Sequence, residues 1–379
     1  MRPVAPLFAL CLILPALPAF AGELEREIEE ALARAYRAAG AQPPRPDKDL
    51  ALAAVRLAER ALRDGVREAV DVEACAEELS RVGAWDPPPR TVAVRASPPA
   101  RAASALAGRS DLAATPATHF GLGIATKDGA AAAVLLLSSR RALLDPFPRK
   151  VEVGASETLS GKLAFPLHDA RVFVTAPGGD AGAVATEGKG RNTFRADLHF
   201  PSPGLYTVEV VAESIKGPEV AALFRVRAGE ARGGAIAKAA EVAERDDLER
   251  ATAQVLEALS ARRRSHGLRP LARSALLDSV AEAHAAEMVR FGYFAHVSPI
   301  SGDVGNRLKQ AGFAFARVTE NLGEAETALA AHRLIEASPG HLANMIDPEV
   351  DLVGLGAAKV RRGSLENVVL VEVFARRQP

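Results

Sequence analysis

The sequence predicts an α+β protein of three domains, in which an all-β domain separates two domains that mix helices and strands. Apolar residues recur at helical spacing in much of 22–144 and 246–379, whereas residues 145–229 alternate polar and apolar side chains at the spacing of strands. The chain has 379 residues, 48% of them hydrophobic, which is enough for more than one hydrophobic core. We therefore expect separate domains rather than a single one.

The first 21 residues have the pattern of a secretory signal peptide. Met1-Arg2 precedes an apolar run from Leu7 to Leu14, and Ala19-Phe20-Ala21 provides a small-x-small cleavage site. A transmembrane anchor is the alternative, but the run is short, prolines interrupt its end, and charged residues follow at once. We expect a secreted or periplasmic protein with no transmembrane segment after cleavage.

The charge balance argues against a nucleic-acid partner, and the cysteine content argues against stabilisation by disulfides. Lys+Arg and Asp+Glu are equal at 47 each, so no net charge attracts nucleic acid or an anionic membrane, and no nucleic-acid partner is expected. Once Cys11 leaves with the signal peptide, Cys75 is the only cysteine, and no intramolecular disulfide can form. Stability must then come from packing, with Cys75 as a small buried residue.

An internal repeat relates the two α+β domains. The segment Arg37 to Pro43 aligns with Arg264 to Pro270, and the same register continues through the following helix. Farther along, Gly121-Leu122-Gly123 matches Gly354-Leu355-Gly356 ahead of a hydrophobic strand. We interpret residues 22–144 as a diverged copy of 246–379; the alternative is a chance match between alanine-rich helices.

The central domain, residues 145–229, is predicted to be a small antiparallel β-sandwich. Turn sequences such as Pro177-Gly178-Gly179-Asp180 separate its alternating runs. Gly204-Leu205-Tyr206 ahead of a strand resembles the tyrosine corner of immunoglobulin-like folds, so we expect an immunoglobulin-like sandwich. Residues 230–245 are predicted to form a linker and the start of a helix. The alternating runs are 150–153, 171–174, 194–200, 206–210 and 223–226.

Three polar motifs in the last domain have no counterpart in the first. His296 follows a helix that ends near Gly292, Glu320 precedes Asn321, and His341 lies in Ser338-Pro339-Gly340-His341. Their order, together with the Gly354-Leu355-Gly356 strand, resembles the bacterial SCP-like branch of the CAP superfamily, which includes cysteine-rich secretory proteins, antigen 5 and pathogenesis-related proteins.

That resemblance implies an α-β-α sandwich for residues 246–379, with a cleft where two histidines and acidic residues meet. It places His296, Glu320 and His341 at three of four cleft positions. Many relatives carry a second glutamate on the helix before the last histidine, but Ser338 stands at that position here. Glu336 is a possible substitute, so the fourth position stays open.

Local physical chemistry gives His341 a further reason for interest. Ser338-Pro339 predicts a helix N-cap followed by proline at the first helical position, so His341 lies in the first turn. The positive end of the helix dipole disfavours a charged imidazole, although a nearby Glu320 would favour it. Neutral His296 and His341 together with Glu320 could bind Zn²⁺ or another divalent cation. No cofactor is certain, because the same cluster could instead be a hydrogen-bonded polar core.

Other polar residues near these motifs receive structural interpretations. Asn321, Ser338 and Asn344 are predicted to belong to the cleft, where we expect Asn321 and Asn344 to bond loop backbone. His284 has the helical spacing of an inward-facing residue, and His332 is predicted to lie on a helix surface. Ser298 and Ser338 lack the Gly-x-Ser-x-Gly setting of a hydrolase nucleophile.

Three functions remain open at this point. The first is a non-enzymatic exported protein that binds a ligand, a lipid, or an envelope or extracellular protein through the CAP cleft. The second is a hydrolase that uses a histidine or a metal-bound hydroxide. The third is an architectural envelope protein. The missing nucleophile and the lack of cleft histidines in the first copy favour binding over catalysis.

Overall fold

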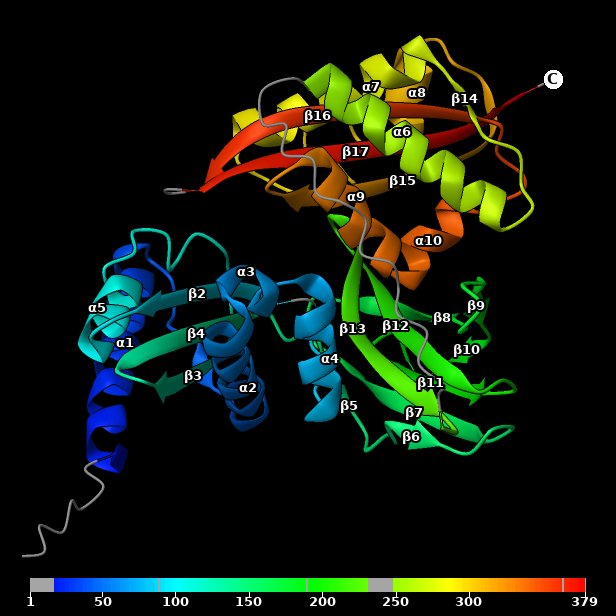
Figure 1. Ribbon diagram of the computed structural model, residues 1–379. Coiled ribbons are helices and arrows are strands. Elements are labelled where there is room, and N and C mark those ends of the chain that lie inside the picture. The colour runs from blue at the N-terminus through cyan, green and yellow to red at the C-terminus, as the bar shows by residue number, and fades with distance from the viewer. Residues whose placement is uncertain (1–16, 88, 189, 231–247, 363–364, 379) are drawn as a thin grey trace, which may run out of the picture.

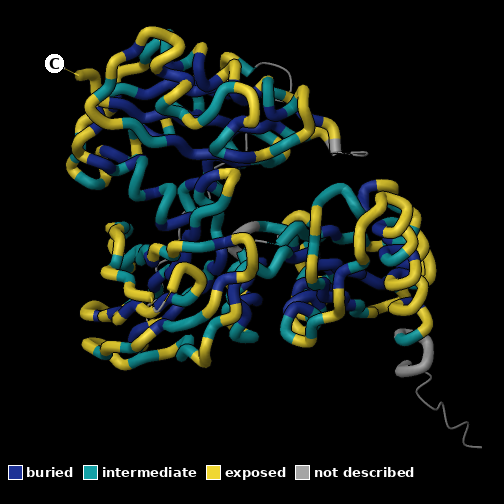
Figure 2. Tube along the Cα trace, turned by 180° about the vertical axis from the view of Figure 1, so that it is seen from behind, coloured by how far each residue is buried: buried dark blue, intermediate teal, exposed yellow. Residues whose placement is uncertain are grey.

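The computed structural model describes residues 17–87, 89–188, 190–230, 248–362 and 365–378. The chain is a mixed α+β protein, as predicted, and it forms three bodies that each have a buried interior (Figures 1 and 2). The predicted linker at 230–245, apart from its first residue, and most of the predicted signal peptide at 1–21 lie outside the described residues. No described helix is both long and apolar enough to cross a membrane.

The N-terminal domain is a four-stranded sheet with helices on both faces (Figure 1). The sheet order is β1-β3-β4-β2, with β1 parallel to β3 and the other pairs antiparallel. One core lies under α1 and α5, and a second lies under α2 and α4. Its elements are α1 (Leu17–Ala38), β1 (Arg45–Pro46), α2 (Lys48–Asp64), α3 (Val66–Ala69), α4 (Val72–Arg81), β2 (Arg90–Ala96), α5 (Pro99–Ala107), β3 (His119–Lys127) and β4 (Ala130–Ser138).

The C-terminal domain has the same kind of layering around the sheet β14-β16-β17-β15. Helices α6 and α9 contribute to the core on one face, and α7 covers the other, giving three layers. Its elements are α6 (Leu248–Ser265), β14 (Ala272–Arg273), α7 (Ala275–Phe291), α8 (Val304–Gln310), β15 (Phe315–Ala325), α9 (Ala328–Ala337), α10 (Pro339–Met345), β16 (Leu352–Arg362) and β17 (Leu365–Arg377).

The second glycine of the aligned Gly-Leu-Gly motifs, Gly123 in the first domain and Gly356 in the last, allows the same close contact in both domains. A Cβ on Gly123 would lie 2.1 Å from the backbone nitrogen of Val55 in α2, and a Cβ on Gly356 would lie 2.1 Å from that of Glu282 in α7. Glycine therefore lets a helix backbone rest directly on the sheet. This likeness agrees with the predicted repeat, while common descent of the two domains stays a prediction.

The central domain consists of two antiparallel-rich sheets, β10-β11-β7-β5 and β6-β13-β12-β8-β9, that share one hydrophobic core. Tyr206 Oη donates to the Ser202 carbonyl (3.0 Å) and accepts from the Ser202 N–H (2.9 Å), the bonding expected of a tyrosine corner. The strands are β5 (Ala142–Leu144), β6 (Lys150–Val151), β7 (Ser156–Leu163), β8 (His168–Thr175), β9 (Ala181–Val184), β10 (Thr186–Glu187), β11 (Thr193–His199), β12 (Gly204–Ser214) and β13 (Gly217–Ala228).

The boundary between the first two domains differs slightly from the one predicted at 144/145. Strand β5 pairs with β7, and Ala142 belongs to the central core, so the change of domain falls near Arg140-Arg141. Trp85 ties the two domains together: its indole N–H donates to the Ala142 carbonyl and its own carbonyl accepts from Leu223 N–H, each at 2.9 Å.

Candidate functional site

The residues predicted to form the cleft lie near the free edge of the C-terminal sheet, where β15 is the outermost strand. Glu320 on β15 points to the α7 face, because Leu322, two residues along the strand, belongs to that core. His296 lies in the loop after α7, which ends at Gly292 in the left-handed conformation (φ 70°, ψ 31°). His341 lies in the first turn of α10. The fold thus brings the three predicted residues to one region.

Glu320 is held by two donors. Its Oε1 lies 3.0 Å from Nδ1 of His296, and its Oε2 accepts from Nη2 of Arg307. Burial raises the pKa of Glu320, but the His296 hydrogen bond and the Arg307 charge outweigh burial, so the pKa lies below its usual value. An ionised Glu320 can only accept, and His296 therefore keeps its proton on Nδ1 when the ring is neutral.

His341 follows the predicted helix cap. Ser338 is the N-cap of α10, its Oγ accepts from the His341 N–H (3.3 Å), and Pro339 begins the helix, which confirms this prediction. Burial and then the charge of His296 lower the pKa of His341 to about 3, so the ring is neutral near pH 7, and its Nδ1 is buried without a partner among the described residues. The His296 and His341 rings lie 6.3 Å apart between centroids.

The geometry does not support the predicted metal site of His296, His341 and Glu320. In the described part of the chain, no three His, Cys, Asp or Glu side chains gather as a set that could hold a metal ion. Both oxygens of Glu320 are already engaged, and the Arg307 guanidinium puts a positive charge where a cation would have to approach. The residues present therefore do not fit a three-ligand Zn²⁺ centre.

A second polar network lies on the opposite face of β15. Asn321 Nδ2 donates to the His341 carbonyl (3.2 Å) and to Oε2 of Glu372 on β17 (3.1 Å), while its Oδ1 accepts from Asn344 Nδ2 (2.9 Å). Asn321 thus bonds the backbone of helix α10 rather than loop backbone, and Asn344 bonds another side chain, so neither bonds a loop as predicted. The network fixes the backbone of His341 from within the domain.

The prediction that His332 lies on a helix surface is wrong. His332 is 1% exposed, because α9 packs against both the sheet and α6, and its Nδ1 lies 2.6 Å from Oε1 of Glu372. Burial lowers the pKa of His332, but Glu372 outweighs burial and raises it above the usual value. The inward orientation predicted for His284 is confirmed: the residue is fully buried, with Nε2 3.1 Å from the Ala295 carbonyl.

The central domain supplies a residue that the sequence analysis missed. Glu209 of β12 accepts from Ser338 Oγ (2.7 Å) and from the Gly340 N–H (2.6 Å) at the start of α10. Burial raises the pKa of Glu209 to about 7, although these two hydrogen bonds act in the opposite direction. Glu336, the possible fourth cleft residue, instead pairs with Arg262 of α6. Arg307, Glu372 and Glu209 belong to no motif, so only the three-dimensional contacts identify them.

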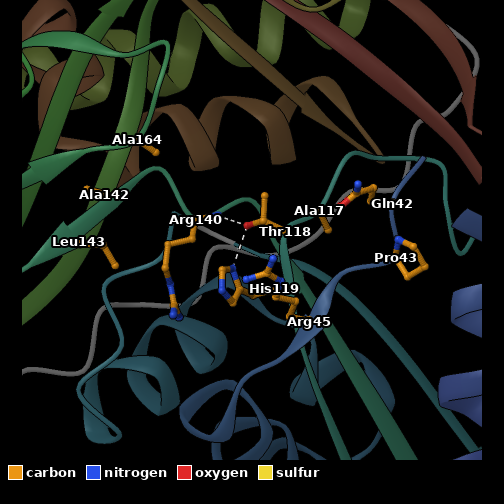
Figure 3. Close-up of a pocket in the computed structure, with 10 residues that line it drawn as sticks. All are labelled: Gln42, Pro43, Arg45, Ala117, Thr118, His119, Arg140, Ala142, Leu143 and Ala164. Atoms are coloured by element: carbon orange, nitrogen blue, oxygen red, sulfur yellow. Dashed lines mark hydrogen bonds between the residues drawn. The ribbon is translucent and has the colours of Figure 1, made fainter. Parts of the chain in front are cut away.

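A separate hollow of about 410 Å³ lies between the N-terminal and central domains (Figure 3). His119 and Arg140 line it, and Thr118 bonds to both. Arg140 pairs with Asp47 and Asp86 at 2.9 Å each, so its charge is balanced within the protein. Burial and then the Arg140 charge lower the pKa of His119. Arg45 also lines the hollow, and the two arginines balance the charges of Asp47 and Asp86, so the hollow offers little net charge to a ligand.

Comparison with known proteins identifies the C-terminal domain. Residues 256–374 match the family model of the cysteine-rich secretory protein family, CAP. The uncharacterized protein YkwD of Bacillus subtilis (strain 168) is 28% identical over 106 residues, which are 27% of this chain, and the chain spans 40% of that relative's length. Residues 256–374 therefore form a CAP domain, of the bacterial SCP-like kind that the motifs predicted.

Solved structures include two similar chains. An outer surface protein from Borrelia burgdorferi is 16% identical, with a TM-score of 0.32, and the match covers 36% of this chain and 100% of that one. An extracellular protein containing an SCP domain from Bacillus anthracis str. Ames is also 16% identical, with a TM-score of 0.31, and the match covers 58% of this chain and 78% of the other.

Proposed function

We propose that this is an exported binding protein that engages a ligand or protein partner at the His296–His341 cleft of its CAP domain, without catalysis by the cleft. The observation that carries the proposal is that the carboxylate and the hydroxyl of the cleft, Glu320 and Ser338, are committed to other protein groups. Glu320 is occupied by His296 and Arg307, and Ser338 by Glu209. Such a site is a rigid, preorganised surface rather than a set of free acids and bases.

Both serines near the motif histidines are also engaged in structural contacts. Ser298 Oγ donates to Glu287 and accepts from the N–H groups of Ile300 (2.9 Å) and Ser301 (2.8 Å), which fixes the His296 loop. Ser338 Oγ donates to Glu209 and caps α10. In the described structure neither hydroxyl bonds a histidine ring that could activate it, which argues against a serine hydrolase.

Apolar side chains around the His296 loop indicate where a partner would bind. Phe291, Phe294 and Ile300 are exposed within ten residues of sequence, and Ile215 is exposed on the β12–β13 hairpin that touches this loop. Exposed apolar groups concentrated beside a polar cleft are typical of an interaction surface. They support an apolar or protein partner, such as a lipid, an envelope component or an extracellular protein.

The wider architecture forms part of the same proposal. We propose an immunoglobulin-like central domain, supported by the two sheets and the Tyr206–Ser202 bonds, and an N-terminal domain that is a diverged CAP-like copy without cleft histidines. The shared strand order and the Gly123 and Gly356 contacts support the second point. The role of this copy is then structural, and the signal-peptide pattern of residues 1–21 supports export.

The binding proposal is tested with the mature protein and two fractions of its source cells, isolated envelopes and secreted proteins. We expect the Phe294→Ser, Ile300→Ser double variant to bind about tenfold more weakly than wild type, as for an interface anchor. Val153→Ser is the matched control, because Val153 is similarly exposed at the other end of the central domain. Equal binding by the double variant would contradict the proposed surface.

Catalysis is tested separately. Casein and p-nitrophenyl acetate are incubated with the mature protein and with a His296→Ala, His341→Ala double variant. We expect no difference between the two proteins. Hydrolysis by the wild type that disappears in the double variant would replace the binding proposal with the hydrolase alternative.

A further inference from the structure

The outward face of strand β12 is buried by another domain. Tyr206, Val208 and Val210 point into the core of the central sandwich, so the intervening residue Glu209 points away from it. An outward glutamate on a strand is ordinarily solvated, but Glu209 is 0% exposed. Helix α10 of the CAP domain packs on β8, β9 and β12 and removes this position from water.

Glu209 holds the first turn of α10 at two points. One carboxylate oxygen accepts from the helix cap, Ser338, and the other from the N–H of Gly340, the residue directly before His341. A Cβ on Gly340 would lie only 2.8 Å from Glu209 Oε2, so a residue without a side chain allows this close approach. No basic side chain pairs with Glu209 in the described structure, and the helix start is its only polar contact there.

The hairpin at the end of the same strand reaches the other histidine. The carbonyl of Lys216 accepts from the N–H of Val297 at 2.9 Å, and a Cβ on Gly217 would lie 2.8 Å from the Cβ of His296. Two separate contacts of the central domain therefore converge on the segments that carry His296 and His341.

We propose that the central domain forms one wall of the His296–His341 cleft, and that Glu209 is the positioning residue that fixes His341 through the first turn of α10. The functional unit is then the CAP domain together with the central domain. This inference deepens the proposed function and rests on it for the identity of the binding site. The contacts themselves do not depend on any ligand.

Carbethoxylation of histidines by diethylpyrocarbonate, read by mass spectrometry of the full-length protein, tests the proposal. In Glu209→Ala we expect His341 to react about tenfold faster than in wild type, because two hydrogen bonds to a carboxylate are lost. The exposed His199 serves as the reference for reagent activity, and the buried His284 and His332 report on the CAP interior. These last two should keep their wild-type rates.

The pH profile of labelling separates positioning from general loosening, since only neutral imidazole reacts. In wild type the rate at His341 should not fall between pH 7.5 and 5.5, because its own pKa is about 3 and protonation of Glu209, whose pKa is about 7, can only loosen the helix start. In Glu209→Ala the rate should fall with a midpoint near 6.5, the ordinary histidine value. An unchanged rate and profile at His341, or an equal rise at His284 and His332, would overturn the proposal.

Gly340→Ala provides a second variant that keeps the carboxylate but displaces it. Alanine has a higher helix propensity than glycine, so faster labelling of His341 can come only from the disturbed domain contact. Glu213→Gln is the matched control, since Glu213 lies on the same strand but pairs with Arg171 at the surface. Labelling reads access and not binding, so it remains decisive even if no partner is found in the binding test.

Discussion

The N-terminal and CAP domains share a strand order but differ at the positions that make a cleft. The strand register aligns them: Gly354 faces Val373 as Gly121 faces Leu136. By the same register Thr91 takes the place of Glu320. One sheet edge therefore carries a buried carboxylate in the CAP domain and a hydroxyl in the first domain.

The neighbouring register positions show the same replacement. Val92 stands where the CAP domain has Asn321, and Leu135 stands where it has Glu372. Both residues are buried in an apolar core. Helix α10 also has no helical counterpart among residues 108–118. A sheet with this strand order can therefore pack with apolar residues at these positions. The fold itself does not require the polar side chains of Asn321 and Glu372.

The largest expected effect comes from replacing Glu372 of the CAP domain with leucine, the residue at the equivalent position of the first domain. Glu372→Leu leaves His332 and Asn321 without their buried acceptor, and we expect the CAP domain to lose about 4 kcal/mol of stability. Hydrogen exchange of the β17 amides measures the loss. Glu366→Gln, in an exposed pair on the same strand, should change little. A loss below about 1 kcal/mol in Glu372→Leu would show that the network is dispensable.

The shared glycine contact predicts a matched loss in both domains. A methyl group at Gly123 or Gly356 collides with helix backbone, and we expect each alanine variant to lose about 3 kcal/mol. Fluorescence of Trp85, the single tryptophan, reports unfolding on the N-terminal side, and hydrogen exchange reports the CAP side. Gly182→Ala, with open space around it, is the neutral control. A loss of stability in only one of the two variants would contradict the equivalence of the two glycine contacts.

His341 makes the CAP domain sensitive to acid, and His119, whose pKa is also lowered, acts in the same direction in the first domain. Its folded pKa of about 3 lies below the unfolded value near 6.5, so the unfolded state binds the extra proton and stability falls as the pH drops below about 6.5. His341→Gln should therefore gain up to about 2 kcal/mol relative to wild type between pH 7 and pH 5. Urea unfolding at both pH values measures the gain, and a constant difference would refute it.

The smallest effect is expected at the counterpart of Glu320. Thr91 Oγ1 lies 3.5 Å from Sγ of buried Cys75, a weak contact, so Thr91→Val should cost no more than about 1 kcal/mol. Trp85 fluorescence during urea unfolding gives the value. A much larger cost would mean that this position retains a polar role in the first domain.

Residues close in sequence to a motif were predicted well. Ser338, Pro339 and His341 follow from local helix chemistry, and Gly292 ends α7 as its position indicates. Alternation along 206–210 predicted a strand, and β12 is that strand, with Tyr206 and Val208 in the core. Local pattern is sufficient wherever the deciding contact lies within one element and its nearest partner.

Contacts between distant elements were not predictable in the same way. Alternation makes Glu209 an outward residue, and nothing local says that α10 covers it. His332 lies on the buried face of α9 with Ala328 and Ile335, so helical spacing could have predicted its burial, but not its partner Glu372 on β17. The obstacle to the predicted metal site was hidden for the same reason. The Arg307 guanidinium contacts Glu320 only in the folded domain, so the sequence alone does not reveal this pair.

The hydrogen bond between Glu209 and Ser338 joins residues 129 positions apart, and this distance sets an order of assembly. A chain made or exported from its N-terminus presents strand β12 well before α10, and domains tend to fold in that order. The central domain can then be folded already when the CAP domain folds against it. The cleft of the CAP domain would then be the last part of the molecule to form. Its geometry would depend on whether the central domain had already folded.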